Sequence, residues 1–215
     1  MILLFCKEDI YSNKAIEIAN ELFKNKEIIV YKGNRSKPFP KLNNSIKPNI
    51  IISFLSPWII PESLLFKSNL SINFHPGTHH YPGTGCYNFA LYENAKNYGS
   101  VCHHMNSTVD TGNIIDEKTF FSGNVKSVLE LKTLTMNSMI IQFKKIVSII
   151  SSNKKLPKSN IQWSRKPFIR KELEELRKIS LDMTKIEINN RIKAISFPGY
   201  PGVEIDLHGI KFINT

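Results

Sequence analysis

Three polar side chains, Asn73, His75 and Asp110, have types and spacing that suit the transfer of an acyl group to an amine. Asn73 and His75 are two residues apart in the apolar run "LSINFH", and Asp110 follows a later extended run. Residues two apart on a strand project from the same face. An amide N–H can stabilise an oxyanion, an imidazole can exchange a proton, and a carboxylate can orient the imidazole or accept a proton through water. A purely structural interpretation stays open, in which Asn73 caps a turn and His75 is an ordinary loop histidine.

The loop after this run, "GTHHYPGTG", is long and rich in His, Pro and Gly, unlike most connections between buried elements. Its histidines, together with Cys102, His103 and His104, form a group that could hold a metal ion. A Pro-Gly pair, however, prevents helical spacing between His75 and His79, and adjacent side chains on a strand point to opposite faces. We therefore predict no metal site.

Two further stretches have both a functional and a structural interpretation. "VDTGN" contains the Asp-Thr-Gly of aspartic proteases, which need two carboxylates that share a proton. The motif occurs once, in a chain whose pattern is α/β. A protease therefore stays open only as a dimer, in which each chain would supply one of the two carboxylates. "SFPGYPGVEI" places Phe197 and Tyr200 between Pro-Gly pairs, either as a turn packed on the core or as a platform for a flat ring such as a nucleotide base.

An alternation of strands and helices must position these residues. Continuous β-branched runs such as "PNIIISFLS" are typical of strands buried on both faces of a parallel sheet, and Ser12 is the expected N-cap of the first helix. In open α/β sheets, ligands bind at the carboxyl ends of the strands, where "NFHPG" lies. The expected elements are strands over 2–6, 27–33, 48–56 and 70–74, extended segments over 98–105 and 112–121, and helices over 12–26, 61–68, 87–97 and 125–152.

The order of these elements predicts an α/β fold with an open, mostly parallel, Rossmann-like sheet and helices on both faces. A polar, Lys-rich segment over 152–160 is the expected linker. It divides the chain into a main domain of residues 1–152 and a small carboxyl-terminal extension of residues 153–215. The extension is expected to contain helices within 162–179 and 182–196, the second with a capping box of Thr184 and Glu187, and a β-hairpin over 202–215.

The composition fits a globular protein of one sizeable domain, or of about 150 residues with an appendage. The chain has 215 residues, of which 41% are hydrophobic and 22% charged. Its formal net charge of +11 suits polyanions, membranes or small phosphorylated substrates without choosing among them. It equally fits a Lys-rich composition bias, because the lysines are scattered rather than striped. "MILLFCKED" lacks a basic leader and a cleavage site, and polar residues interrupt the longest apolar segment. Three Cys without a Cys-x-x-Cys indicate reduced thiols, so we expect a cytoplasmic protein with no membrane association.

Together, these segments resemble the formyltransferases that use N10-formyltetrahydrofolate. The family pattern is a strand ending in Asn-x-His-Pro, a Gly-containing loop, a helix, a His, and Val-Asp-x-Gly-x-Ile-Ile. It appears as "INFHPG", "YPGTGCYNFALYENAKNYGSVCHHM" and "VDTGNII". A weaker match covers "RKELEELRKISLDMTKIEINNRIKAISFPGYPGVEIDLHGIKF" in the extension. The resemblance implies that Asn73, His75 and Asp110 are the catalytic trio.

Within that family, the chain looks more like the sugar N-formyltransferases that act on nucleotide-linked amino sugars. Its loop departs from the Ser-Leu-Leu-Pro that follows His-Pro in purine-pathway and methionyl-tRNA formyltransferases, and the extension leaves little room for a full carboxyl-terminal barrel. The resemblance implies N10-formyltetrahydrofolate as formyl donor and a dTDP-amino-dideoxyhexose as acceptor, for lipopolysaccharide O-antigen or other surface polysaccharide. A methionyl-tRNA formyltransferase and a non-catalytic folate or nucleotide binder are the alternatives. Nucleic acid is not the expected partner, and a homodimer is left open.

The resemblance also implies a mechanism and further site residues. The free amine attacks the formyl carbon, Asn73 and His75 stabilise the oxyanion, and Asp110 positions His75 and helps to remove the proton of the ammonium. Residues 77–85 are expected to form the wall between folate and acceptor. Other residues are expected beside the ligands: Trp58, Ile59, Ile60, His104 and Met105 for the cofactor, and Tyr81, Trp163, Arg165, Arg170, Phe197 and Tyr200 for the substrate.

Overall fold

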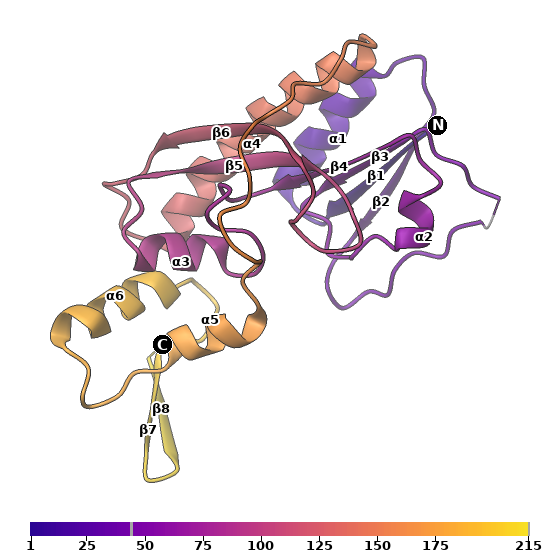
Figure 1. The fold of residues 1–215 in the computed structure, drawn as a ribbon. Coiled ribbons are helices and arrows are strands. Elements are labelled where there is room, and N and C mark those ends of the chain that lie inside the picture. The colour runs from indigo at the N-terminus through magenta and orange to yellow at the C-terminus, as the bar shows by residue number, and fades with distance from the viewer. Residues whose placement is uncertain (44, 215) are drawn as a thin grey trace.

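The structure, a computed structural model, describes residues 1–43 and 45–214. Within them, one six-stranded sheet consists of β1 (Ile2–Lys7), β2 (Ile28–Gly33), β3 (Ile50–Phe54), β4 (Leu70–His75), β5 (Asn97–His104) and β6 (Ile114–Phe121). The strand order is β2-β1-β3-β4-β5-β6 (Figure 1). β1 pairs in parallel with β2 and β3, and β3 with β4, whereas β5 runs antiparallel to β4 and β6. The predicted open, mostly parallel sheet is confirmed.

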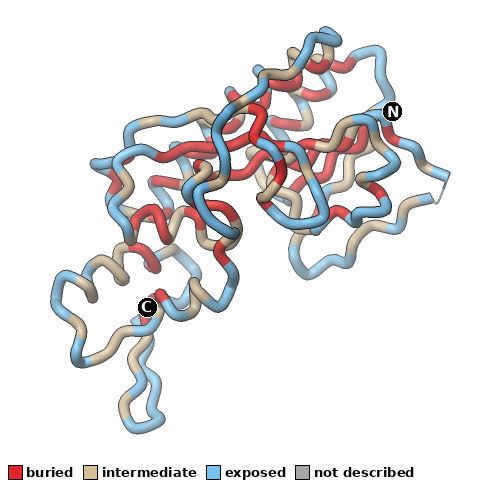
Figure 2. The backbone as a smooth tube through the Cα atoms, in the orientation of Figure 1, coloured by how far each residue is buried: buried red, intermediate tan, exposed pale blue. Residues whose placement is uncertain are grey.

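Alternate side chains of the sheet pack against helices on opposite faces. On one face, Leu4 belongs to a buried cluster with residues of α1 (Ile10–Leu22) and α4 (Val128–Ser151). On the other face, Leu3 packs with residues of α2 (Glu62–Leu65). Figure 2 shows that burial is concentrated along the inner strands and the helix faces that cover them. Because helices cover both faces of the sheet, the sequences of its inner strands are continuous apolar runs.

The first helix begins earlier than its sequence pattern predicts. Its N-cap is Asp9, whose carboxylate accepts a hydrogen bond from the Ser12 N–H at 2.8 Å, so the prediction of Ser12 as the cap is wrong. Asp9 satisfies one of the N–H groups that a helix start leaves free, and Ser12 lies buried in the first turn. The predicted cap of the last helix is confirmed, because the Thr184 hydroxyl accepts from the Glu187 N–H at 3.2 Å.

The chain after α4 forms a smaller unit that packs on α3 (Cys86–Tyr92). Its elements are α5 (Arg170–Arg177), α6 (Lys185–Ile195), β7 (Glu204–Leu207) and β8 (Ile210–Ile213). Phe89 of α3, Leu131 of α4, Leu176 of α5 and Ala194 of α6 share one buried cluster. The extension is thus anchored to the main sheet through α3 and α4. The division into two domains at residue 152 stays a prediction.

The segment between α4 and α5 crosses in front of the sheet as an extended chain (Figure 1). The helix predicted within 162–179 is therefore confirmed only over α5. The predicted hairpin is confirmed, since β7 and β8 pair antiparallel, while Thr215, the last residue of the predicted segment, lies outside the described residues. Among the residues that the structure describes, no helix is both long enough and apolar enough to span a bilayer.

Candidate active site

The carboxyl end of β4 places Asn73 and His75 on the face of the sheet that α2 covers. Asn73 is in register with Ser53 of β3, which is in register with Phe5 of β1, and Phe5 packs in the cluster of α2. On the other side, the antiparallel pairing sets Asn73 opposite His103 of β5. The register of the sheet therefore brings an amide and two imidazoles together at one edge.

Asp110 reaches the same point from the loop between β5 and β6. Its backbone is left-handed, with a φ of 48°, a conformation that Asp adopts more readily than most residues. The loop also packs closely on β5, because a Cβ on Gly112 would lie 1.7 Å from the carbonyl oxygen of His104. A glycine is thus required at that position for Asp110 to lie beneath β4 and β5.

Asp110 is buried and joins the residues of the cluster through both carboxylate oxygens. Oδ2 lies 3.0 Å from Nδ1 of His75 and accepts a hydrogen bond from the Gly83 N–H at 2.9 Å. Oδ1 lies 3.3 Å from Nε2 of His103 and 3.3 Å from Nδ2 of Asn73. The structure therefore brings the predicted trio into contact. We call Asn73, His75, His103 and Asp110 the Asp110 cluster.

Both ring nitrogens of His75 face hydrogen-bond acceptors. Nδ1 faces the Asp110 carboxylate, and Nε2 lies 2.8 Å from the carbonyl oxygen of Tyr81. Burial alone would lower the pKa of His75, but the charge of Asp110 and the hydrogen bonds to Asp110 and Tyr81 raise this pKa above its usual value. Burial alone would raise the pKa of Asp110, but the charge of His75 and the hydrogen bonds from His103 and His75 hold it well below its usual range. The pair is a buried imidazolium and carboxylate.

These opposite shifts predict that the chain is most stable at mildly acidic pH. The raised pKa of His75 adds stability that is complete below the unfolded value of about 6.5 and is lost as pH rises through the folded value. The lowered pKa of Asp110 adds stability that is complete above the unfolded value of about 3.9 and is lost as pH falls through the folded value. Both contributions are complete between about pH 4 and pH 6.5.

Calorimetric melting temperatures across a pH series measure this effect. The wild type is expected to lose stability from about pH 6.5 upward, and His75→Gln is expected to lose part of that dependence. A melting temperature that rises steadily through the same alkaline range in the wild type would contradict the prediction.

His103 is a member of the cluster that the sequence interpretation did not select. Its Nδ1 donates to the carbonyl oxygen of His104 at 2.8 Å, and its Nε2 lies 3.0 Å from Nδ2 of Asn73. One hydrogen of the Asn73 amide faces Asp110, and the other faces Nε2 of His103, which can accept from Asn73 or donate to Asp110 but cannot do both. An incoming oxyanion must replace one of these partners of Asn73. Strand alternation indicates that one residue of the pair His103-His104 points inward and the other to solvent, but only the pairing of β4 with β5 shows that His103 meets Asn73.

Trp163, a predicted substrate residue, lies beside the cluster. Its Nε1 donates to the carbonyl oxygen of Gly112 at 2.8 Å. The indole meets the rings of His75 and His103 edge-on, with centroid distances of 5.8 and 5.2 Å. The extended segment before α5 therefore covers the imidazoles from the side opposite the strands.

The same segment is fixed to the loop after β4. Phe168 donates its N–H to the carbonyl oxygen of Pro82 at 2.9 Å, and its own carbonyl accepts from the Thr84 N–H at 2.8 Å. The guanidinium of Arg165, another predicted substrate residue, lies 3.3 Å from the ring centroid of Phe168 and pairs with Glu172 at 2.7 Å. Arg165 thus stabilises this junction.

Other predicted substrate residues lie apart from the cluster. The Tyr81 hydroxyl donates to Glu93 at 2.9 Å, so only the backbone of Tyr81 meets His75. Arg170 is exposed and pairs with Glu174. Phe197 and Tyr200 contact each other edge-on in the turn after α6, with centroids 5.5 Å apart. No contact of the described residues links Arg170 or this aromatic turn to the cluster, and their substrate role stays a prediction.

Three of the predicted cofactor residues, Trp58, Ile60 and Met105, pack on the α2 face of the sheet. Ile60 is buried, and Trp58 and Met105 pack with it in the cluster that contains α2. Ile59 presents 71% of its surface to solvent, and His104 is exposed at the end of β5. His104 is in register with Ile72, which packs on the α1 and α4 face, so His104 lies on the face of the sheet opposite Asn73.

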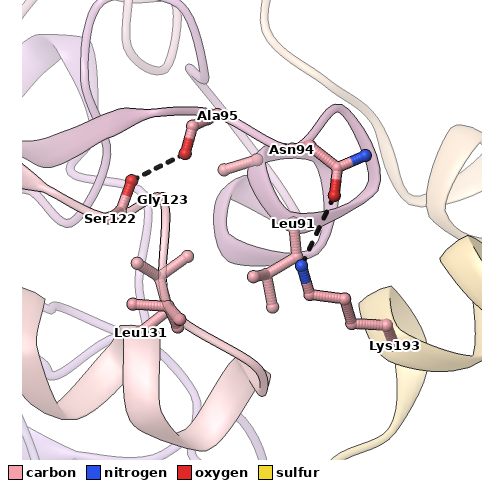
Figure 3. Close-up of a pocket in the computed structure, with 9 residues that line it drawn as sticks. Leu91, Asn94, Ala95, Ser122, Gly123, Leu131 and Lys193 are labelled. Carbon is pink, nitrogen blue, oxygen red and sulfur yellow. Dashed lines mark hydrogen bonds between the residues drawn. The ribbon is translucent and has the colours of Figure 1, made fainter.

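Two of the hollows that described residues line lie apart from the Asp110 cluster. The smaller lies between α3, the end of β6 and α4 (Figure 3). Its volume of about 20 Å³ suits about one water molecule. Lys193 donates to Asn94 at 3.4 Å at its rim, and Ser122 donates to Ala95 at 2.8 Å (Figure 3). The larger is a surface groove between α3, α5 and α6.

No protein-family model matches the chain, and no curated protein matches it. Solved structures match over nearly its full length. A sugar N-formyltransferase from Shewanella sp FDAARGOS_354 has a TM-score of 0.78 at 18% identity, over 99% of this chain and 95% of that one. A 4-N formyltransferase from Francisella tularensis has a TM-score of 0.77 at 19% identity, over 99% and 96%.

A third structure is an N-formyltransferase from Helicobacter canadensis in complex with folinic acid and dTDP-3-aminofucose. It has a TM-score of 0.75 at 22% identity, over 97% of this chain and 85% of that one. A methionyl-tRNA formyltransferase from Clostridium thermocellum matches with a TM-score of 0.60 at 15% identity. The chain therefore has the fold of the sugar N-formyltransferases.

Proposed function

We propose that this protein is an enzyme that transfers a formyl group from N10-formyltetrahydrofolate to the amino group of a nucleotide-linked amino sugar. The observation that carries the proposal is the Asp110 cluster at the carboxyl end of β4, on a fold shared with sugar N-formyltransferases. A dTDP-amino-dideoxyhexose is the acceptor that we expect, because one structure with this fold holds dTDP-3-aminofucose. Its formylated product would serve surface polysaccharide synthesis.

The segment between β3 and α2 supports a folate as the formyl donor. Residues 55–61 form no regular element, so their backbone groups are not part of a strand or helix ladder and could pair with the edge of a heterocycle. The exceptions are the backbone groups of Trp58, which pair with the Ser56 hydroxyl, and the Pro61 carbonyl, which pairs with α2. The Trp58 indole is fixed by a hydrogen bond from Nε1 to the carbonyl oxygen of Lys37 at 2.9 Å, and Ile59 offers exposed apolar surface. A flat ring bound here would lie on the same face of the sheet as Asn73.

In the proposed reaction, the unprotonated amine attacks the formyl carbon, and the formyl oxygen gains negative charge. The Asn73 amide and the Nε2–H of His75 are the donors placed to stabilise this oxyanion, once the substrate oxygen replaces their present partners. His75 passes a proton to N10 as the bond between N10 and the formyl carbon breaks, and it regains a proton from the attacking nitrogen. The new amide and tetrahydrofolate are the products.

Asp110 is assigned the role of holding His75 protonated and oriented. The second role expected from the resemblance, removal of the amine proton by Asp110 through water, is disfavoured because its lowered pKa makes the carboxylate a weak base. The hydrogen bonds from Gly83, His75 and His103 further engage its oxygens.

Mass spectrometry tests the proposal directly. The protein is incubated with N10-formyltetrahydrofolate and a panel of dTDP- and UDP-linked amino sugars, with methionyl-tRNA as a control acceptor. We expect a formylated nucleotide sugar that depends on both donor and protein. Formylation of the tRNA alone would favour the tRNA alternative. Binding of folate and nucleotide sugar without any formylated product would favour the non-catalytic binder.

A further inference from the structure

A tight turn next to the Asp110 cluster determines what faces the second nitrogen of His75. The turn covers residues 78–81 and is closed by a hydrogen bond from the Tyr81 N–H to the Thr78 carbonyl oxygen at 2.9 Å. The carbonyl of Tyr81 lies 2.8 Å from Nε2 of His75. A shift of this turn by a fraction of an ångström would therefore change the hydrogen bonding and the orientation of the imidazole.

Glu117 of β6 anchors this turn from the sheet. Its Oε1 accepts a hydrogen bond from the backbone N–H of His79 at 2.8 Å and lies 2.8 Å from Nδ1 of the same residue. The Glu117 side chain is only 8% exposed, although it is a carboxylate. Hydrogen bonds to an ionised acceptor are among the stronger ones in proteins. The nearly buried Glu117 carboxylate thus holds one backbone N–H of the turn in place.

The strand register explains how Glu117 reaches a loop that starts two strands away. His75 of β4 is in register with Val101 of β5, and Val101 is in register with Glu117 of β6. The three side chains lie in one row on one face of the sheet, with Glu117 about 10 Å from the strand of His75. The chain after His75 leads to His79, whose backbone N–H lies 2.8 Å from Oε1 of Glu117.

Glu117 is one of several contacts that hold the turn, since the Tyr81 hydroxyl at the other end of the turn donates to Glu93 at 2.9 Å. The Thr78 hydroxyl is buried, and no described residue supplies it with a hydrogen-bond partner. On the side opposite Glu117, the Ser164 N–H donates to the His79 carbonyl oxygen at 3.1 Å, and Nδ1 of His80 lies 3.2 Å from the Ser164 hydroxyl. The turn is thus held between β6 and the segment that carries Trp163.

We propose that Glu117 is a positioning residue, which holds the 78–81 turn so that the Tyr81 carbonyl meets Nε2 of His75. The inference rests on the proposed function only in treating His75 as a reacting group. Other neighbours of His75, namely Asp110 and the ring of Trp163, come from segments other than the turn that Glu117 anchors.

The test follows the titration of His75 by NMR in protein with labelled histidine, with the six histidines assigned by substitution. Glu117→Ala is expected to lower the pH at which His75 titrates, because the Tyr81 hydrogen bond raises the pKa of His75 and would be weakened. We also expect kcat to fall at least tenfold with the KM for the formyl donor unchanged. Glu117→Gln is expected to restore most of both, since its amide oxygen can still accept from the His79 N–H.

Thr119→Ala provides the matched control, because Thr119 is exposed on the same face of β6 and two residues away from Glu117. It should leave kcat and the His75 titration unchanged. If Glu117→Ala does not fold, Glu117→Asp keeps the charge, withdraws the carboxylate by one methylene and should still shift the titration. A folded Glu117→Ala or Glu117→Asp with an unchanged His75 titration would overturn the proposal. The titration of His75 needs no substrate. It therefore tests the role of Glu117 even if the wild-type protein transfers no formyl group.

Discussion

Replacing Asp110 with Asn is expected to lower kcat by a factor of about 10² to 10⁴ while the chain still folds. The carboxylate accepts hydrogen bonds that a carboxamide cannot all accept, because an amide presents an NH2 group in place of one oxygen. That NH2 would face Nδ1 of His75 or Nε2 of His103, which lie 3.0 and 3.3 Å from the carboxylate oxygens. His75 would then lose its charge and its preferred orientation, and with them the ability to stabilise an oxyanion.

The Asp110→Asn variant should remain folded because it loses only some of the hydrogen bonds of the Asp110 cluster. An unsatisfied buried partner costs about 1–3 kcal/mol, which is less than the 5–15 kcal/mol by which domains are usually stable. Turnover is measured with the acceptor identified by mass spectrometry, and folding by circular dichroism. Asp116→Asn is the matched control, since it neutralises a carboxylate of β6 that pairs with Lys145 on the opposite face, while the Asn oxygen can still accept from Gln142. Near-normal turnover of Asp110→Asn would remove Asp110 from the mechanism.

The residues of the trio could be predicted because local patterns reveal them. The alternation of side chains on a strand fixes Asn73 and His75 on one side, and the end of an apolar run marks the carboxyl edge of a sheet. Asp110 was predicted from the order of motifs along the chain. What the sequence could not provide is the shared hydrogen-bonding geometry, which depends on a left-handed residue in the loop between β5 and β6.

His103 and Glu117 were missed because their importance comes from strand pairing rather than from local sequence. Asn73 meets His103 only because β4 and β5 pair antiparallel in one particular register. Glu117 meets His79 only because the next pairing extends the row of His75 across β6. A shift of one residue in either register would turn these side chains to the other face. Single-sequence patterns determine the faces of each strand, but not which strands are neighbours.

The aromatic turn of Phe197 and Tyr200 shows what residue types alone cannot establish. Its residue types suit a base platform, yet the two rings contact each other, and Lys132 of α4 lies 5.2 Å above Phe197. Composition alone cannot distinguish a ligand platform from a turn that packs on a neighbouring helix. The substrate role of this turn stays a prediction, whereas the Ser12 prediction failed because Asp9 is an equally good cap and begins the helix earlier.

The second large effect is expected from Gly83→Ala, because Gly83 joins the loop after β4, the segment before α5 and Asp110. Its φ is +88°, and a Cβ would lie 2.4 Å from the carbonyl oxygen of Phe168. A left-handed conformation alone costs an Ala about 1–2 kcal/mol, and the clash with backbone cannot be relieved by a rotamer change. We expect a loss of about 3 kcal/mol or more in the free energy of unfolding.

Gly199→Ala separates the two causes of this loss. Gly199 also has a positive φ, of 77°, but a Cβ there would meet nothing within 4 Å. It should therefore cost only the conformational term, about 1–2 kcal/mol, whereas Gly83→Ala should cost clearly more in urea unfolding. Gly83→Ala should also lower kcat at least tenfold, because relief of the clash moves the Gly83 N–H away from Asp110, to which it donates at 2.9 Å. Equal losses of stability in the two variants, with kcat unchanged in Gly83→Ala, would show that the junction of loop and segment does not position the Asp110 cluster.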